Sequence, residues 1–169
     1  MKRFFILLVV SCVASLNHAQ ADRVDHKVMN ILFEPIIEID FINDSRRAST
    51  EGKHLMVMFV KDGCVPCIKM KQQVLSDPKV TTFFKQNFIS YRVNIFGDLP
   101  VIDHGGKMMT EKTYARREGI WGTPTFHFYG ANGQLIRKRT GFLSVRDFIG
   151  LGEHVVSRSY KTAKSTVNF

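Results

Sequence analysis

The chain has 169 residues, a formal net charge of +9, 44% hydrophobic residues and only 3 cysteines. This length and hydrophobic content suit one compact domain with a single core. The 14 phenylalanines beside so few cysteines exclude a disordered chain, a collagen-like repeat, a coiled coil and a disulfide-dense mini-protein. The basic residues are scattered, and the one dense run, Arg137–Arg139, suits a solvated edge strand. We therefore expect no nucleic-acid partner.

Residues 1–21 have the features of a secretory signal. A basic Lys2-Arg3 pair is followed by an apolar run over Phe4–Leu16, and Ala19-Gln20-Ala21 is a small-x-small cleavage pattern. The run has about 13 residues, whereas a helix needs about 20 to cross a bilayer. Cleavage after Ala21 predicts a periplasmic or secreted protein in an oxidising compartment.

A second interpretation treats Val9-Val10-Ser11-Cys12 as a lipoprotein signal, in which Cys12 would be retained, acylated and used as an anchor. Both interpretations export the protein. Cleavage after Ala21 removes Cys12, so the odd cysteine count becomes a single pair, Cys64 and Cys67.

The remaining chain divides into an extension at 22–52, a domain at 53–158 and a tail at 159–169. The extension has apolar residues at helical spacing and then a polar run over 43–52, and we expect helices in it. Within the domain, hydrophobic periodicity and turn residues predict alternating strands and helices, hence an α/β fold. The expected elements are a buried central strand at 55–60, helices at 64–76 and 78–87, a strand at 88–95, a long loop at 96–109, a helix at 110–119, a hairpin of strands 125–129 and 135–140, and a helix at 144–156.

Three helix starts carry specific signals. Asp77-Pro78 combines an N-cap with proline at the first helical position. Ser144 with Asp147 approximates a capping box, and Leu143 with Phe148 suits a hydrophobic staple. Thr110 is the expected cap of the helix that ends at Gly119.

The strongest chemical motif is Cys64-Val65-Pro66-Cys67, between a buried strand and a helix. A helix N-terminus offers free N–H groups and a positive dipole end, which favour a thiolate on Cys64. We expect Cys64 to be exposed and to act as the nucleophile, and Cys67, turned toward the core, to resolve the mixed disulfide. Pro66 costs little there because its missing N–H would have been unpaired.

Two structural interpretations of this motif stay open. A Cys-x-x-Cys can be half of a zinc site, but the processed chain has no other cysteine and its histidines show no paired ligand spacing, so we expect no metal. It can also be an inert disulfide, although closing so short a loop stabilises a fold little. The methionines Met56, Met58 and Met70 are expected to fill the core.

Pro124 is the second chemical feature. The run Gly122-Thr123-Pro124-Thr125 opens a strand, and a proline there needs a reason such as a cis bond or an edge position. The adjacent Trp121 is expected either to shape a substrate surface or to cap the core.

Together these motifs resemble the thioredoxin-like family, and most of all the secreted bacterial thioredoxins such as the periplasmic thioredoxin of sulfur-oxidation systems. The resemblance runs from Lys53 to about Val156. It rests on segments 62–70, 74–78, 94–98, 109–112 and 119–126.

The resemblance implies a thioredoxin fold, in which a central mixed β-sheet and flanking helices form three layers. It also implies Cys64 as the attacking cysteine, Cys67 as the resolving cysteine, and Thr123 with a cis Pro124 as the edge where a substrate peptide pairs. It predicts no cofactor, protein thiols or disulfides as substrates, and a membrane electron-transfer reductase as the electron donor.

The chain departs from the family pattern at two places. Gly63 replaces the tryptophan that usually precedes the motif, and Met58 stands where a buried acid is usual, so the proton acceptor for Cys67 is open between Asp62 and a water. The Val65-Pro66 dipeptide lacks histidine and favours a reductase. A disulfide oxidase, an isomerase and a non-enzymatic binding module remain alternatives.

Overall fold

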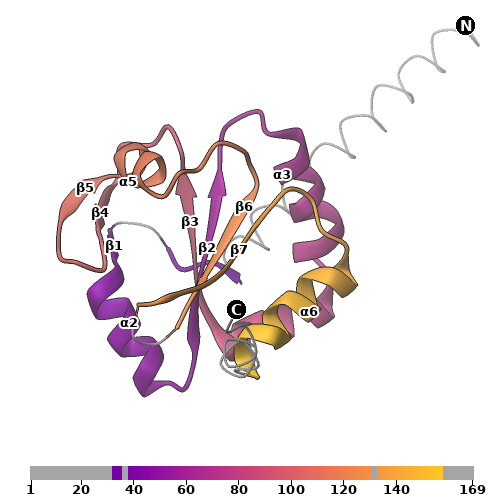
Figure 1. Cartoon of the computed structure of the whole chain (residues 1–169). Coiled ribbons are helices and arrows are strands. Elements are labelled where there is room, and N and C mark those ends of the chain that lie inside the picture. The colour runs from indigo at the N-terminus through magenta and orange to yellow at the C-terminus, as the bar shows by residue number, and fades with distance from the viewer. Residues whose placement is uncertain (1–31, 36–37, 131–132, 158–169) are drawn as a thin grey trace, which may run out of the picture.

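The computed structural model describes residues 32–35, 38–130 and 133–157 (Figure 1). The predicted signal at 1–21, with Cys12 and Ala21, and the predicted tail at 159–169 lie outside the described residues. Within the described residues, no helix is both long enough and apolar enough to cross a membrane.

A four-stranded mixed sheet forms the centre of the molecule. Its order is β3 (Phe88–Asn94), β2 (His54–Val60), β6 (Thr125–Tyr129) and β7 (Leu135–Thr140), with β2 parallel to β3 and antiparallel to β6. Six consecutive buried residues from position 55 to 60 place β2 in the middle, as predicted from its unbroken apolar run. The hairpin of β6 and β7 is confirmed, and β7 is the exposed edge strand.

The two faces of the sheet carry separate cores because successive side chains of a strand point to opposite faces. One face packs against α3 (Val65–Met70), α4 (Pro78–Asn87) and α6 (Val145–Val156) and includes both cysteines of the motif. The other packs against α2 (Phe41–Thr50) and α5 (Glu111–Arg117). The predicted three-layer thioredoxin fold is therefore confirmed (Figure 1).

The predicted helix at 64–76 contains a change of winding. Helix α3 runs directly into η1 (Lys71–Leu75), a π-helical turn, before α4 begins at Pro78. Met70, Val74 and Leu75 from these two segments are buried in the same core cluster. The two windings therefore share one buried face, although their hydrogen-bond ladders differ.

The predicted caps of α4 and α6 are confirmed. The Asp77 carboxylate accepts a hydrogen bond from the Lys79 N–H at 2.8 Å. The Ser144 hydroxyl oxygen accepts from the Asp147 N–H at 3.2 Å and its O–H donates to the Asp147 carboxylate at 2.7 Å. Thr110 precedes α5 as expected but makes no side-chain cap bond. Its hydroxyl lies instead 3.0 Å from that of Thr113.

The prediction of a long loop at 96–109 is wrong. This segment contains β4 (Pro100–Ile102) and the first residues of β5 (Met108–Thr110), which pair antiparallel with each other. Strand β4 also pairs in parallel with β1 (Ile39–Asp40) to make a separate three-stranded sheet. Strands of two or three residues have no readable period, so their pairing with a segment distant in sequence could not be recognised.

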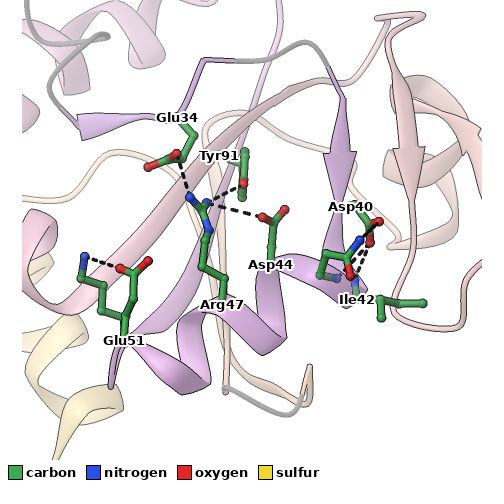
Figure 2. A network of polar contacts seen from close by, with 9 residues as sticks. Glu34, Asp40, Ile42, Asp44, Arg47, Glu51 and Tyr91 are labelled. Atoms are coloured by element: carbon green, nitrogen blue, oxygen red, sulfur yellow. Dashed lines mark hydrogen bonds and ion pairs between the residues drawn. The ribbon is translucent and has the colours of Figure 1, made fainter.

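Helix α2 is held to the body of the fold by Arg47, as Figure 2 shows. Its guanidinium lies 3.3 Å from the Glu34 carboxylate and 3.4 Å from that of Asp44, and it donates to the Tyr91 hydroxyl of β3 at 3.0 Å. Burial raises the pKa of Tyr91, so this hydroxyl stays protonated. One side chain thus connects α2, the central sheet and the segment that precedes β1.

Candidate active site

Cys64 is positioned by the way β2 ends. The strand stops at Val60, and residues 61–63 form an exposed turn in which Gly63 adopts a φ of +68°. A residue with a Cβ is strained in that conformation, so glycine suits the position where typical thioredoxins carry tryptophan. Cys64 then has extended backbone angles and is the N-cap of α3.

Cys64 and Cys67 form a disulfide with their Cα atoms 5.2 Å apart. The Cys67 N–H points at the Cys64 sulfur at 3.2 Å, as an N-terminal helix donor would point at an anion. Pro66 lies in the first turn of α3, where no hydrogen bond is lost. The helix therefore donates a hydrogen bond to Cys64 without losing any backbone hydrogen bond of its own.

A second segment, distant in sequence, contacts the same Cys64 sulfur. The Thr123–Pro124 peptide bond is cis, and the Thr123 carbonyl oxygen lies 3.4 Å from Cys64 Sγ. The Thr123 hydroxyl donates to Cys64 Sγ at 3.2 Å. The structure thus brings Thr123 against the disulfide of Cys64 and Cys67, and Pro124 follows Thr123 through the cis bond.

The expectation that Cys64 is exposed is wrong. Only 4% of Cys64 and 3% of Cys67 are accessible, so both cysteines belong to the core cluster. Thr123, which is 59 residues further along the chain, contacts the Cys64 sulfur with both its carbonyl and its hydroxyl. In the disulfide form, the carbonyl and hydroxyl of Thr123 therefore cover the sulfur.

Trp121 is 94% exposed, so the alternative in which it caps the core is wrong. It lies two residues before Thr123, on the segment that touches the disulfide. Three further exposed apolar side chains come from elements that hold the site: Val65, Ile68 and Phe142. Sequence reasoning missed them because their neighbours in sequence do not show which side of the fold they face.

Phe142 is placed near the site by backbone contacts. The N–H of Gly141 donates to the Pro124 carbonyl at 2.8 Å, and the N–H of Leu143 lies 3.4 Å from the Met70 sulfur of α3. The turn between β7 and α6 is therefore fixed between the proline segment and the helix that carries the cysteines.

The buried side of the disulfide is apolar. Met58, at the position of the usual acid, is 1% exposed and shares a core cluster with both cysteines. The described buried carboxylates are Asp103 and Glu111, and both are held on the α5 side of the sheet, by Arg117 and by the Asn94 N–H. Asp62 is exposed. No described carboxylate is therefore buried beside Cys67.

A polar network lies on the opposite face of the sheet and was not predicted. The Tyr114 and Tyr129 hydroxyls are 2.9 Å apart, and Tyr129 is also 3.0 Å from His127 Nδ1. Burial raises the pKa of both tyrosines. A hydrogen bond with His127 lowers the pKa of Glu118, which stays ionised at the edge of this network.

Within the described residues, no group of three or more histidine, cysteine, aspartate or glutamate side chains is arranged to hold a metal ion. The two cysteines are already bonded to each other. The chemistry that this arrangement offers is therefore exchange at a disulfide with one helix donor and one hydroxyl donor on the same sulfur.

Known structures share this fold. The structure is similar to a thioredoxin-fold protein from Helicobacter pylori, with a TM-score of 0.65, 20% identity and coverage of 82% of this chain and 84% of that chain. It is also similar to a thioredoxin from Thermus thermophilus, with a TM-score of 0.58, 22% identity and coverage of 80% and 98%. The oxidised C-terminal domain of Neisseria meningitidis DsbD gives a TM-score of 0.51, 18% identity and coverage of 66% and 89%.

No curated protein sequence matches the chain. The model of the thioredoxin-like domain family matches residues 42–155, which include the disulfide, Thr123 and Pro124. This match spans well over half of the sequence and begins at the second residue of α2. The chain therefore belongs to the thioredoxin-like family.

Proposed function

We propose that the protein is an exported thiol–disulfide oxidoreductase that reduces disulfides in periplasmic client proteins. The observation that carries this proposal is the position of Cys64, with the Cys67 N–H and the Thr123 hydroxyl both 3.2 Å from its sulfur. Two donors on one sulfur stabilise a thiolate when the disulfide is reduced, and the thiolate is the species that attacks a disulfide.

The reaction proceeds in two exchanges. The Cys64 thiolate attacks a client disulfide, so a Cys64–client bond forms and the other client sulfur leaves as a thiolate. The Cys67 thiolate then attacks Cys64, which restores the Cys64–Cys67 disulfide and releases the second client sulfur. Two electrons pass to the client in each cycle, and a membrane electron-transfer reductase returns them to the cysteine pair.

The same site accounts for the order of the two cysteines. Cys64 is the N-cap and receives both donors, whereas Cys67 lies inside the first turn of α3 against the core. Displacement of the Thr123 side chain as a client docks would expose Cys64, the N-cap, before Cys67. The apolar side chains of Trp121, Val65 and Phe142 then supply a surface for the client beside the Thr123 backbone.

Deprotonation of Cys67 must use a group other than a buried acid. Met58 provides no acceptor, and Asp62 lies on the exposed turn before the motif. A water that enters beside the cysteines after reduction is the acceptor we propose. This makes the second exchange the step that depends most strongly on pH.

Insulin reduction tests the proposed activity. We expect Cys64→Ser to abolish it and Cys67→Ser to accumulate a mixed disulfide with the client, because the first exchange then has no resolving thiolate. A Cys64→Ser variant with unchanged activity would exclude this mechanism. Urea unfolding of both variants controls for loss of the fold.

The direction of electron flow is tested separately by equilibration with glutathione. The reductase proposal rests on Val65-Pro66 between the cysteines, without histidine. It requires a reduction potential below about −200 mV, on the scale where thioredoxin is near −270 mV and a strong oxidase near −120 mV. A value near the oxidase would make the protein a donor of disulfides instead.

Export is tested by mass spectrometry of the protein recovered from cells. Cleavage after Ala21 gives a mature chain that begins at Asp22. An acylated N-terminal Cys12 would show the lipoprotein route instead. Both outcomes keep the proposed activity, whereas an uncleaved cytoplasmic protein contradicts the proposed location.

A further inference from the structure

A groove of about 690 Å³ lies between the edge strand β7 and helix α6, away from the disulfide. Its lining is strongly basic, with four cationic residues and a single carboxylate, that of Asp147. This carboxylate is already engaged by Ser144 and is 3.7 Å from Arg146 Nε. The cationic residues at the border of the groove are Arg137, Arg139 and Arg146, together with Lys138, whose side chain the strand register directs to the opposite face of the sheet.

The strand register explains how the groove is built. Arg139 is opposite Phe126 and Arg137 is opposite Phe128, and both phenylalanines are buried in the core that α6 covers. Opposed residues of an antiparallel pair point to the same face. Arg137 and Arg139 therefore project on the α6 side of the sheet, and Lys138, opposite His127, projects on the other side.

The α6 wall presents one stripe at helical spacing, consisting of Arg146, Gly150 and His154. Gly150 leaves space: a Cβ built on it would meet nothing within 4 Å. The buried Leu143 and the half-buried Leu151 form the apolar floor. The groove thus has cationic residues on both walls, and Gly150 leaves space at the middle of its α6 wall.

The outer edge of β7 has no partner strand among the described residues, because the sheet order ends at β7 (Figure 1). No described carboxylate forms an ion pair with Arg137 or Arg139 either. A free strand edge binds an extended chain through backbone hydrogen bonds, and the side chains beside it select the sequence.

We propose that this groove binds an extended acidic segment of a partner protein, which adds to β7 as a further strand. Residues i and i+2 of the added strand would face Arg137 and Arg139, since side chains alternate along a strand. The preferred segment therefore carries aspartate or glutamate at alternate positions, with small or apolar residues between them. This interaction surface is separate from the disulfide and does not require the redox reaction.

The test uses a fluorescein-labelled peptide, Thr-Glu-Val-Glu-Val-Glu-Thr, and fluorescence anisotropy at low and physiological salt. Arg139→Glu and Lys138→Glu change the charge equally on one strand but on opposite faces. We expect Arg139→Glu to weaken binding about fivefold to tenfold, and Lys138→Glu at most about twofold. Arg139→Gln should give an intermediate loss.

Three results support or overturn the proposal. Replacing the three glutamates by glutamine, or methylating the peptide amide nitrogens, should each abolish binding; an N-methylated peptide that binds equally well leaves only charge attraction and overturns strand addition. Equal losses in both charge variants overturn the assigned face. Preferential binding of phosphatidylglycerol vesicles that is also lost in Arg139→Glu would make the groove a lipid site instead.

The test is independent of the proposed redox activity. A Cys64→Ser, Cys67→Ser double variant should bind the peptide as the parent does while reducing no insulin. Loss of peptide binding in this double variant with intact α6 would contradict a separate surface. Circular dichroism of each variant confirms that the fold is retained.

Discussion

A single substitution can test how much the Thr123 hydroxyl stabilises the Cys64 thiolate. This hydroxyl donates to Cys64 Sγ at 3.2 Å, and replacement of Thr123 by valine keeps the shape of the side chain. A hydrogen bond to a charged group contributes about 1.5–3 kcal/mol. Thr123→Val removes that contribution from the Cys64 thiolate and leaves the Cys67 N–H in place.

The loss converts directly into measurable shifts. One pKa unit corresponds to about 1.4 kcal/mol, so the pKa of the reduced Cys64 thiol should rise by about one to two units. The reduced form loses the same stabilisation above that pKa. Since about 30 mV corresponds to about 1.4 kcal/mol, the reduction potential should fall by about 30–60 mV.

The pH dependence of alkylation by iodoacetamide measures the first quantity, and equilibration with glutathione measures the second. Thr125→Val is the matched control, because its hydroxyl bonds to the Gly122 carbonyl and the Thr140 hydroxyl rather than to the disulfide. A Cys64 pKa in Thr123→Val within about 0.3 units of the parent would refute the reasoning, as would an equal shift in the control.

Three further predictions concern stability, each measured by urea unfolding. Gly152→Ala should destabilise the fold by about 1–3 kcal/mol, because a Cβ there would come within 2.6 Å of an aromatic carbon of α4. Gly150→Ala on the same helix meets open space and should stabilise it by up to about 1 kcal/mol; similar losses at both positions would contradict the packing argument. Burial disfavours the ionised Asp103, but two backbone N–H donors and an arginine outweigh it and lower its pKa. Asp103→Asn should therefore cost about 1–3 kcal/mol at pH 7, and the cost should shrink as the pH falls below about 4, where the aspartate of the unfolded chain takes up a proton while that of the folded chain is still ionised. A deficit independent of pH would contradict this. Arg47→Met should cost about 1 kcal/mol through lost contacts to β3 and the preceding segment, whereas Arg46→Met, which loses one bond within its own helix, should cost less.

The sequence alone predicts those helices and strands for which local signals and tertiary packing agree. The unbroken apolar run of β2, the Asp77 cap and the β6–β7 hairpin follow from residues within a few positions of each other. The cysteine motif could be placed at a helix start for the same reason. Local periodicity and turn-forming residues are enough to predict these elements without reference to distant contacts.

Features that depend on distant contacts could not be predicted in this way. Cys64 is buried and is contacted by Thr123 from 59 residues away, and no residue near position 64 indicates this contact. Strands β1 and β4 are too short to show alternation, so their pairing is visible only in three dimensions. The exposed surface around the disulfide, including Phe142, likewise depends on how a turn after β7 meets α3.

The parallel pairing of β1 with β4 has a consequence for the order of folding. Ile39 is opposite Val101, so β1 pairs with β4 across an intervening chain that includes the whole of β2 and β3. Contacts between residues so distant in sequence form slowly, because a long loop must be ordered first. We therefore expect the locally paired β6–β7 hairpin to acquire hydrogen-exchange protection before β1 during refolding.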